Sequence, residues 1–296
     1  MPSGRWFFCE DGKGGKDGKG GKAPKAFRLA SGAGRSFPSF PSFPMIILEN
    51  LTKSFGPKRV LSGVSLEVPD GQNTVIIGQS GSGKSVTLKL IVALLEPDAG
   101  RVLVDDQLVH DLDRAELAEL RGRIGYVFQF AALFDSMTVA ENIGLGLVKR
   151  GLDKATIEER VQESLAVVDL CGTEQKFPAE LSGGMRKRVG IARAIALRPS
   201  YILYDEPTTG LDPVTSAVMD LLMIRTRDLG VTGLIVSHDM RSAFSVGDRI
   251  AMLHQGTIRQ VGTVAEIQAT EDPVVRQFIE GRPDAAPEPA GGRWTE

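Results

Sequence analysis

The sequence has few of the residues that build disulfide scaffolds and metal centres. Among its 296 residues are only two cysteines, Cys9 and Cys171, which lie far apart and outside any CxxC spacing. This arrangement argues against a disulfide scaffold and against a zinc site. The three histidines are scattered along the chain as well, so the sequence contains no His/Cys cluster with metal-ligand spacing.

Long apolar runs are also missing. The stretches Leu90–Leu95 and Tyr201–Tyr204 are far shorter than the roughly 20 apolar residues that a membrane-spanning helix needs. Residues 1–44 contain neither the continuous apolar core nor the small-residue cleavage site of a secretory signal. We therefore expect the protein to stay in the cytosol and, if it works at a membrane, another chain to span that membrane.

Neither sign of charge dominates the chain. The formal net charge is −2, with 42% hydrophobic and 24% charged residues, a composition that allows a sizeable core. Such a balance provides no basic field over the whole protein to attract nucleic acid. We expect no nucleic-acid partner.

The two ends of the chain differ in composition from the rest. Residues 1–44 combine a Gly/Lys stretch with a Phe-Pro-Ser repeat, and residues 282–296 are rich in Pro, Ala and Gly, so we expect both to be disordered. The basic arm over residues 1–44 is either a solvated extension or a segment attracted to anionic lipid headgroups. A third alternative is that the native chain starts at Met45.

Residues 45–281 alternate short β-rich runs with helical stretches, which is typical of an α/β domain with a mostly parallel, doubly wound sheet. The first strands have no helices between them, which indicates an additional antiparallel β layer. A helical stretch over about residues 130–180 lies between core strands and predicts an inserted helical subdomain. The expected strands are 45–48, 64–68, 73–77, 101–104, 124–128, 201–204, 233–236 and 249–254, and the expected helices follow Lys84 and cover about 154–170, 183–197 and 213–229.

A glycine-rich segment after the strand expected at 73–77 fits the phosphate-loop pattern GxxxxGK[ST]. It consists of Gly78, Gln79, Ser80, Gly81, Ser82, Gly83, Lys84 and Ser85. Glycines let the backbone N–H groups point at phosphate oxygens, next to a helix N-terminus that already favours anions. We expect the segment to bind ATP, with Lys84 on the β- and γ-phosphates and the Ser85 hydroxyl on Mg²⁺.

Two acids end the apolar strand expected at 201–204. Nucleotide-bound metal ions are held at such strand ends, so Asp205 is expected to hold Mg²⁺ and Glu206 to polarise the attacking water. The alternative is a solvated carboxylate pair. Because a phosphate loop lies upstream, we favour the hydrolytic interpretation.

Between these two elements, Ser182, Gly183 and Gly184 open a helix and make a second candidate anion site. They belong to the segment Leu181–Met185, which resembles the LSGGQ signature of ATP-binding subunits of ABC transporters, with Met185 in place of the usual Gln. The resemblance covers Met45 to about Gly281 and implies the P-loop NTPase fold of ABC type. The matching motifs follow one another along the chain in the same order as in the family: the phosphate loop, Gln129, the signature, Asp205-Glu206, Leu211-Asp212 and His238.

The resemblance implies that a second copy of the chain completes the site. In this family two subunits form a head-to-tail dimer around two ATP molecules, so Ser182 and Gly184 are expected to contact the ATP of the opposite subunit. Asp212 is expected at the dimer seam.

Three further residues take roles by the same resemblance. Phe55 stands where the family stacks an aromatic side chain on adenine, although a core Phe is the alternative. Gln129 is expected to reach Mg²⁺ or the attacking water and to link the nucleotide to the helical subdomain. His238 is expected to contact the γ-phosphate and to support hydrolysis.

Segments outside these motifs resemble one branch of the family, the Mla and Mce-type ATPases that drive phospholipid traffic between bacterial membranes. These segments are 131–139, 203–213 and 272–281. The resemblance implies a multispanning permease, a lipid-binding substrate protein, and a location at the cytoplasmic face of the inner membrane. The alternatives are another ABC importer, a soluble ABC ATPase without a permease, and a regulator that binds ATP without turnover.

Overall fold

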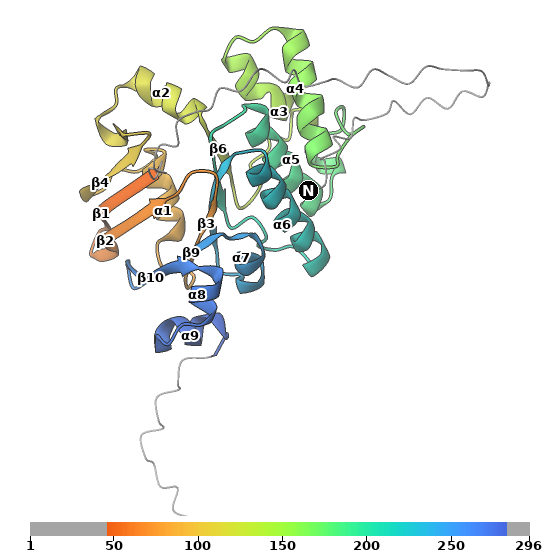
Figure 1. Ribbon diagram of the computed structural model, residues 1–296. Helices are drawn as coiled ribbons and strands as arrows, with labels where there is room; N and C mark the ends of the chain where they lie inside the picture. The colour runs from red at the N-terminus through yellow and green to blue at the C-terminus, as the bar shows by residue number, and fades with distance from the viewer. Residues whose placement is uncertain (1–45, 283–296) are drawn as a thin grey trace, which may run out of the picture.

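The computed structural model describes residues 46–282 and shows two sheets, with helices packed mainly around the larger one (Figure 1). The disordered extension expected over residues 1–44 and, apart from Arg282, the tail expected over residues 282–296 lie outside the described residues. Among the helices of the described part, none is long and apolar enough to cross a membrane.

The smaller sheet is antiparallel and has the strand order β2-β1-β4-β5. In β2, Leu61, Val64, Leu66 and Val68 are buried and most of the intervening positions are exposed or half-buried, so one face of the strand packs inward. The bounds are β1 (Ile46–Phe55), β2 (Lys58–Val68), β4 (Ala99–Val104) and β5 (Gln107–Leu108).

The larger sheet has the order β10-β9-β3-β8-β7-β6, and all its pairs are parallel except β10 with β9. Its central strands β3, β7 and β8 are buried at every position, as expected for parallel strands that are covered on both faces. The bounds are β3 (Asn73–Ile77), β6 (Ile124–Val127), β7 (Tyr201–Asp205), β8 (Thr232–Ser237), β9 (Arg249–His254) and β10 (Thr257–Thr263).

Successive side chains of the central strands enter two different cores. In β7, Ile202 and Tyr204 pack into the core shared with the helices that follow β6, whereas Leu203 packs into the core shared with the antiparallel sheet and α1 (Lys84–Ile91). This alternation follows from the period of two residues in a strand. The larger sheet is therefore the middle layer of the protein.

Helices cover both sides of this layer (Figure 1). Between β6 and β7 the chain forms three helices that pack on one another, and α6 and α7 lie against the same core. The remaining bounds are α2 (Arg114–Gly122), α3 (Val139–Lys149), α4 (Lys154–Val167), α5 (Gly183–Ala196), α6 (Pro213–Asp228), α7 (Met240–Val246), α8 (Val264–Gln268) and α9 (Pro273–Ile279).

The structure confirms the predicted fold class, with a mostly parallel sheet, an antiparallel layer and inserted helices. The strand expected at 45–48 continues to Phe55, because its pairing with β2 runs through several register shifts. The helical stretch expected from about residue 130 starts only at Val139, where Thr138 and Glu141 form a capping box. The elements β5, β10, α2, α7, α8 and α9 were not predicted separately from the sequence.

A buried acid, Asp220, links α6 to α7 through a hydrogen bond. The Ser242 hydroxyl of α7 donates a hydrogen bond to the Asp220 carboxylate of α6, which is 6% exposed. Burial raises the pKa of Asp220, since the desolvated carboxylate is disfavoured, while the bond from Ser242 acts in the opposite direction.

Because the pKa of Asp220 is higher in the folded than in the unfolded protein, its ionisation opposes folding above its native pKa. Asp220→Asn keeps an acceptor for Ser242 and removes this charge. We expect the variant to melt at a higher temperature than the parent at neutral pH, with a difference that shrinks as the pH falls through the native pKa. Thermal unfolding between pH 4 and 8, with the exposed Glu159→Gln as control, measures this. A difference that grows toward acid pH would contradict it.

Candidate nucleotide-binding site

The parallel register brings the ends of three strands to one edge of the sheet. Ile77 of β3 pairs with Ser237 of β8, and Val236 of β8 pairs with Asp205 of β7. The residues that follow these strands are therefore neighbours although they are far apart in sequence. They are the phosphate loop, Glu206 and His238.

The phosphate loop connects β3 to α1, and two of its glycines are required by close packing. A Cβ atom on Gly78 would lie 2.3 Å from the Leu253 carbonyl oxygen. Gly83 precedes α1 in the left-handed region (φ 108°), where a Cβ atom would lie 2.6 Å from a methyl group of Leu61. The segment 78–85 is thus a strand-to-helix turn, the context that the phosphate-loop pattern requires.

Lys84 is a buried cation inside this loop. It is 5% exposed, and its Nζ donates hydrogen bonds to the carbonyl oxygens of Gly78 (2.9 Å) and Gln79 (3.1 Å). The same Nζ lies 3.3 Å from Oε1 of Glu206. A buried ammonium group with only one carboxylate and carbonyl oxygens around it is well suited to attract further negative charge.

Glu206 contacts residues from three different segments at this edge. Its Oε2 lies 2.7 Å from Nδ1 of His238 and accepts a 3.0 Å hydrogen bond from the Thr209 hydroxyl. Its backbone has a φ of 50°, in the left-handed region, and its N–H donates a hydrogen bond to the Val236 carbonyl oxygen. The two carboxylate oxygens therefore connect Lys84 on one side with His238 on the other.

Asp205 and Ser85 form a second polar pair beside Glu206. The Ser85 hydroxyl donates a 2.6 Å hydrogen bond to one carboxylate oxygen of Asp205. The other carboxylate oxygen accepts a 3.1 Å hydrogen bond from the Tyr126 hydroxyl. Burial, together with the nearby Asp205 charge, raises the pKa of Tyr126, so this hydroxyl stays a donor. A hydroxyl and a carboxylate are the oxygen ligands that Mg²⁺ prefers.

The donor set of the site fits Mg²⁺ and a phosphate group. The Ser82 hydroxyl is buried and has no hydrogen-bond partner among the described residues, as expected for a group that awaits a ligand. Residues 46–282 contain no cluster of three or more His, Cys, Asp or Glu side chains that could hold a metal ion by itself. Substrate oxygens and water would complete the coordination, as is usual for Mg²⁺.

Phe55 and Gln129 are positioned by the strands that they end or follow. Phe55 ends β1, is 46% exposed and has the Lys53 ammonium 5.8 Å from its ring centre. It is therefore available for stacking and is not the core residue of the alternative interpretation. Gln129 is half-buried and lies two residues after the end of β6, the strand that pairs with β7.

The signature segment and Asp212 are assembled around α6. Ser182 caps α5 and accepts a bond from the Met185 N–H, and Gly183 is exposed. A Cβ atom on Gly184 would lie 2.4 Å from a methyl carbon of Thr215, in the first turn of α6. Asp212 caps α6, and the Thr215 hydroxyl and backbone N–H groups lower its pKa. The segment expected to bind a second anion is thus built against the first turn of α6.

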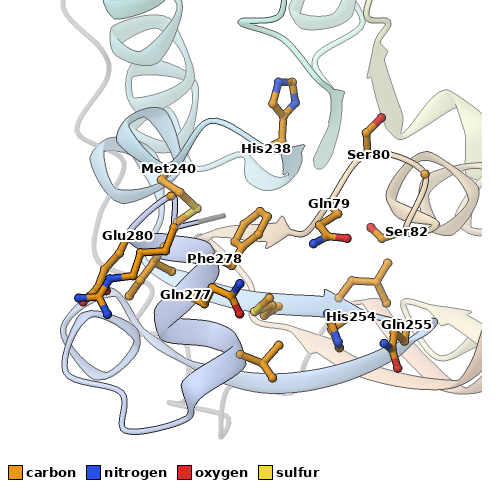
Figure 2. A pocket seen from close by; sticks show the side chains of 17 residues that line it. Gln79, Ser80, Ser82, His238, Met240, His254, Gln255, Gln277, Phe278 and Glu280 are labelled. Atoms are coloured by element: carbon orange, nitrogen blue, oxygen red, sulfur yellow. The ribbon is translucent and has the colours of Figure 1, made fainter. Parts of the chain in front are cut away.

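A pocket lies beside the phosphate loop, and the residues of one of its walls were not predicted from the sequence. Figure 2 shows Gln79, Ser80 and Ser82 on one side and Phe278 of α9 with Met240 on the other, with His238 above them. Neither α9 nor Met240 carries a local motif, so only the tertiary structure reveals their position. Tyr126 and Thr209 were missed too, because their hydroxyls act on acids that belong to distant or irregular segments.

Comparison with known proteins identifies the family. Residues 61–209 match the family model described as ABC transporter. The chain is 42% identical over 239 residues to the probable ribonucleotide transport ATP-binding protein mkl of Mycobacterium leprae, which covers 80% of this chain and 69% of that protein. It is 40% identical over 228 residues to the methionine import ATP-binding protein MetN 1 of Bacillus cereus ATCC 14579, which covers 75% and 66%. The chain belongs to the ABC transporter family and is an ATP-binding subunit of this kind.

Solved structures agree with this assignment. An ATP-binding cassette determined as a dimer in a post-hydrolysis state with ADP and Pi has a TM-score of 0.69 and 34% identity, and the match covers 74% of this chain and 99% of that chain. The cbiO1 protein of Clostridium perfringens, part of the cbiONQ transporter complex, has a TM-score of 0.71 and 29% identity, covering 80% and 94%.

The buried contacts of Lys84 generate a direct prediction. Replacing Lys84 by Ala removes the only side-chain cation that touches both the loop carbonyls and Glu206 in the described residues. Charged hydrogen bonds contribute about 1.5–3 kcal/mol each, so we expect ATP affinity or turnover to fall by at least about tenfold. ATP titration and phosphate release measure the loss, with the exposed Lys89→Ala on the same helix as control. Unchanged binding and turnover in Lys84→Ala would refute the assignment.

Proposed function

We propose that this ATP-binding subunit is a Mg²⁺-dependent ATPase whose hydrolytic centre is the edge formed by the phosphate loop, Asp205, Glu206 and His238. The observation that supports this most is the placement of Glu206, whose carboxylate contacts both the phosphate-loop lysine and His238. A general base must lie within hydrogen-bond reach of the proton that it takes, and the Lys84 ammonium beside Glu206 would bring the γ-phosphate, and a water molecule next to it, close to this carboxylate.

In the proposed reaction, residues 78–85 and Phe55 bind ATP, and Glu206 orients a water molecule toward the γ-phosphorus. The water oxygen forms the new P–O bond, its proton passes toward the Glu206 carboxylate, and the bond to the bridging oxygen of ADP breaks. His238 holds the Glu206 carboxylate through Nδ1 and contributes a polar group near the γ-phosphate. Lys84 stabilises the charge on the phosphate oxygens.

Mg²⁺ would be held by Ser85, Asp205 and Gln129. When bound, it neutralises phosphate charge and orients the phosphates. Tyr126 keeps the Asp205 carboxylate in place through its hydroxyl, so that one oxygen of Asp205 remains directed toward Ser85.

Two copies of the chain would form the working unit, with Ser182, Gly183 and Gly184 of one copy facing the nucleotide of the other and Asp212 at the seam. The support is the position of the signature segment, which is built against α6 and apart from its own phosphate loop. Related cassettes have been solved as dimers.

Replacement of Glu206 by Gln tests the hydrolytic assignment. The amide keeps the shape of the side chain but cannot accept the proton, so we expect ATP binding to persist and hydrolysis to fall by at least about a hundredfold. The ATP-loaded variant should accumulate as a closed dimer. Phosphate release, ATP titration and light scattering, each with and without excess EDTA, measure these effects.

The matched control is Glu159→Gln, which makes the same chemical change on the exposed face of α4. It should hydrolyse ATP at the parental rate. Hydrolysis by Glu206→Gln at that rate would show that another group is the base. Hydrolysis that EDTA leaves unchanged would refute the Mg²⁺ dependence.

For the transported substrate we propose phospholipid or another hydrophobic molecule carried between bacterial membranes. The support is the resemblance of residues 131–139, 203–213 and 272–281 to the Mla and Mce-type ATPases. Phe130 and Phe134 are exposed, at 84% and 52%, on the loop before α3, where an apolar surface can contact a permease. The chain would then work at the cytoplasmic face of the inner membrane with a multispanning permease and a lipid-binding substrate protein.

A second candidate is an importer of another solute. Relatives of comparable identity are named for methionine and for sulfate/thiosulfate import, so a similar ATPase serves different substrates. A soluble ABC ATPase without a permease is the third alternative.

The neighbouring reading frames and the purified complex distinguish these candidates. A permease gene followed by a gene for a single-anchor lipid-binding protein, and copurification of both products with the tagged chain, are expected for the lipid branch. The complex should also show ATPase activity that depends on added phospholipid vesicles. A sugar or amino-acid binding protein in the same operon would contradict the lipid assignment, and the absence of any copurified permease would favour the soluble alternative.

A further inference from the structure

Lys187 is a buried lysine that none of the motifs accounts for. It lies on α5, five residues after the signature serine, and is 8% exposed. Its Nζ donates hydrogen bonds to two backbone carbonyl oxygens, those of Pro207 (2.9 Å) and Thr209 (2.6 Å). A charged side chain is rarely buried without a compensating interaction, so these two bonds define its place in the structure.

The two carbonyls belong to the turn that directly follows Glu206. Glu206 enters this turn with a left-handed backbone (φ 50°), a conformation that is unfavourable for a residue with a side chain. The Thr209 N–H donates a hydrogen bond to the Glu206 carbonyl oxygen, and the Thr209 hydroxyl donates one to the Glu206 carboxylate. The shape of residues 207–209 therefore determines where the Glu206 carboxylate lies.

Electrostatics ties Lys187 to the same carboxylate. Burial lowers the pKa of Lys187, and the nearby Glu206 charge acts in the opposite direction and favours the ammonium form. Lys84 approaches Glu206 from the phosphate loop, whereas Lys187 reaches the turn after Glu206 from α5. The two lysines thus approach this stretch of chain from different elements.

We propose that Lys187 is a positioning residue for ATP hydrolysis, which fixes the turn at residues 207–209, and with it the Glu206 carboxylate, to the helix that begins at Ser182. This inference rests on the proposed function of Glu206. Since one helix carries both Ser182 and Lys187, a shift of α5 at the second anion site moves the anchor of Glu206. The two residues are five positions apart, which corresponds to only about 7.5 Å along a helix.

The experiment compares steady-state ATPase kinetics of the full-length chain with Lys187→Met, Lys187→Gln and Lys187→Arg. Met fills the same space but donates no hydrogen bond, and Gln is too short to reach both carbonyls. For both we expect kcat to fall about tenfold while the KM for ATP changes less than about twofold, because the phosphate loop is untouched. Arg carries several donors on a long stem, so its kcat should recover several-fold over Met.

Lys149→Met, an exposed lysine on α3, is the matched control and should keep parental kinetics. ATP titration of each variant separates positioning from loss of structure, since a misfolded chain loses binding together with turnover. If Lys187→Met does not fold, Lys187→Gln decides the question by the same criteria.

Parental kcat in Lys187→Met or Lys187→Gln would overturn the inference, as would a rise in KM that accounts for the whole loss of activity. Equal kcat values for Arg and Met would overturn it as well. Glu206→Gln, assayed alongside, keeps the two proposals apart. If that variant is inactive and the Lys187 variants are normal, only the role of Lys187 fails; if Glu206→Gln is active, the proposed function fails.

Discussion

The parallel register of β3, β8 and β7 is the constraint on which the candidate site depends. Parallel strands run in the same direction, so the residues that follow each strand gather at one edge of the sheet. Here the pairings Ile77 with Ser237 and Val236 with Asp205 place the phosphate loop, His238 and Glu206 together. A slip of one residue in either pairing would send these side chains to different faces and would exchange the two cores that the strands separate.

At this edge the protein keeps several charged groups out of water, and their arrangement explains why this is tolerable. Lys84, Asp205 and Glu206 are each less than 10% exposed. Each finds a partner of opposite charge or a hydrogen-bonding group, so no charge is buried alone. The left-handed backbone of Glu206 adds a cost that its contacts offset, and strain of this kind is common where side chains must be aimed at a substrate.

Much of this site can be predicted from the sequence because its signals are local. The phosphate loop is eight consecutive residues, and the acid pair ends an apolar run, so both are recognisable without knowledge of the fold. The central strands β3, β7 and β8 were predicted too, because each contains a continuous apolar run in the sequence. Lys187, Tyr126 and α9 were not predicted, since their importance comes from residues that are distant in sequence: Lys187 donates to the carbonyls of Pro207 and Thr209, Tyr126 donates to Asp205, and α9 lines the pocket beside the phosphate loop. The start of the helical subdomain was misplaced because the segment before Thr138 is apolar but does not form a helix.

The signature segment is held in place by its own chain. A helix N-terminus with Ser and Gly residues favours an anion, yet Ser182 uses its own hydroxyl to cap α5 and Gly184 packs tightly on Thr215. These contacts fix the segment to α6, whose first turn is itself held by Asp212. Because α5 also reaches the turn after Glu206 through Lys187, the signature segment and the edge that carries Glu206 share one helix. In the dimer that we propose, a nucleotide at the signature segment of one copy would therefore act on the Glu206 of that copy as well as on the Glu206 beside its own phosphate loop.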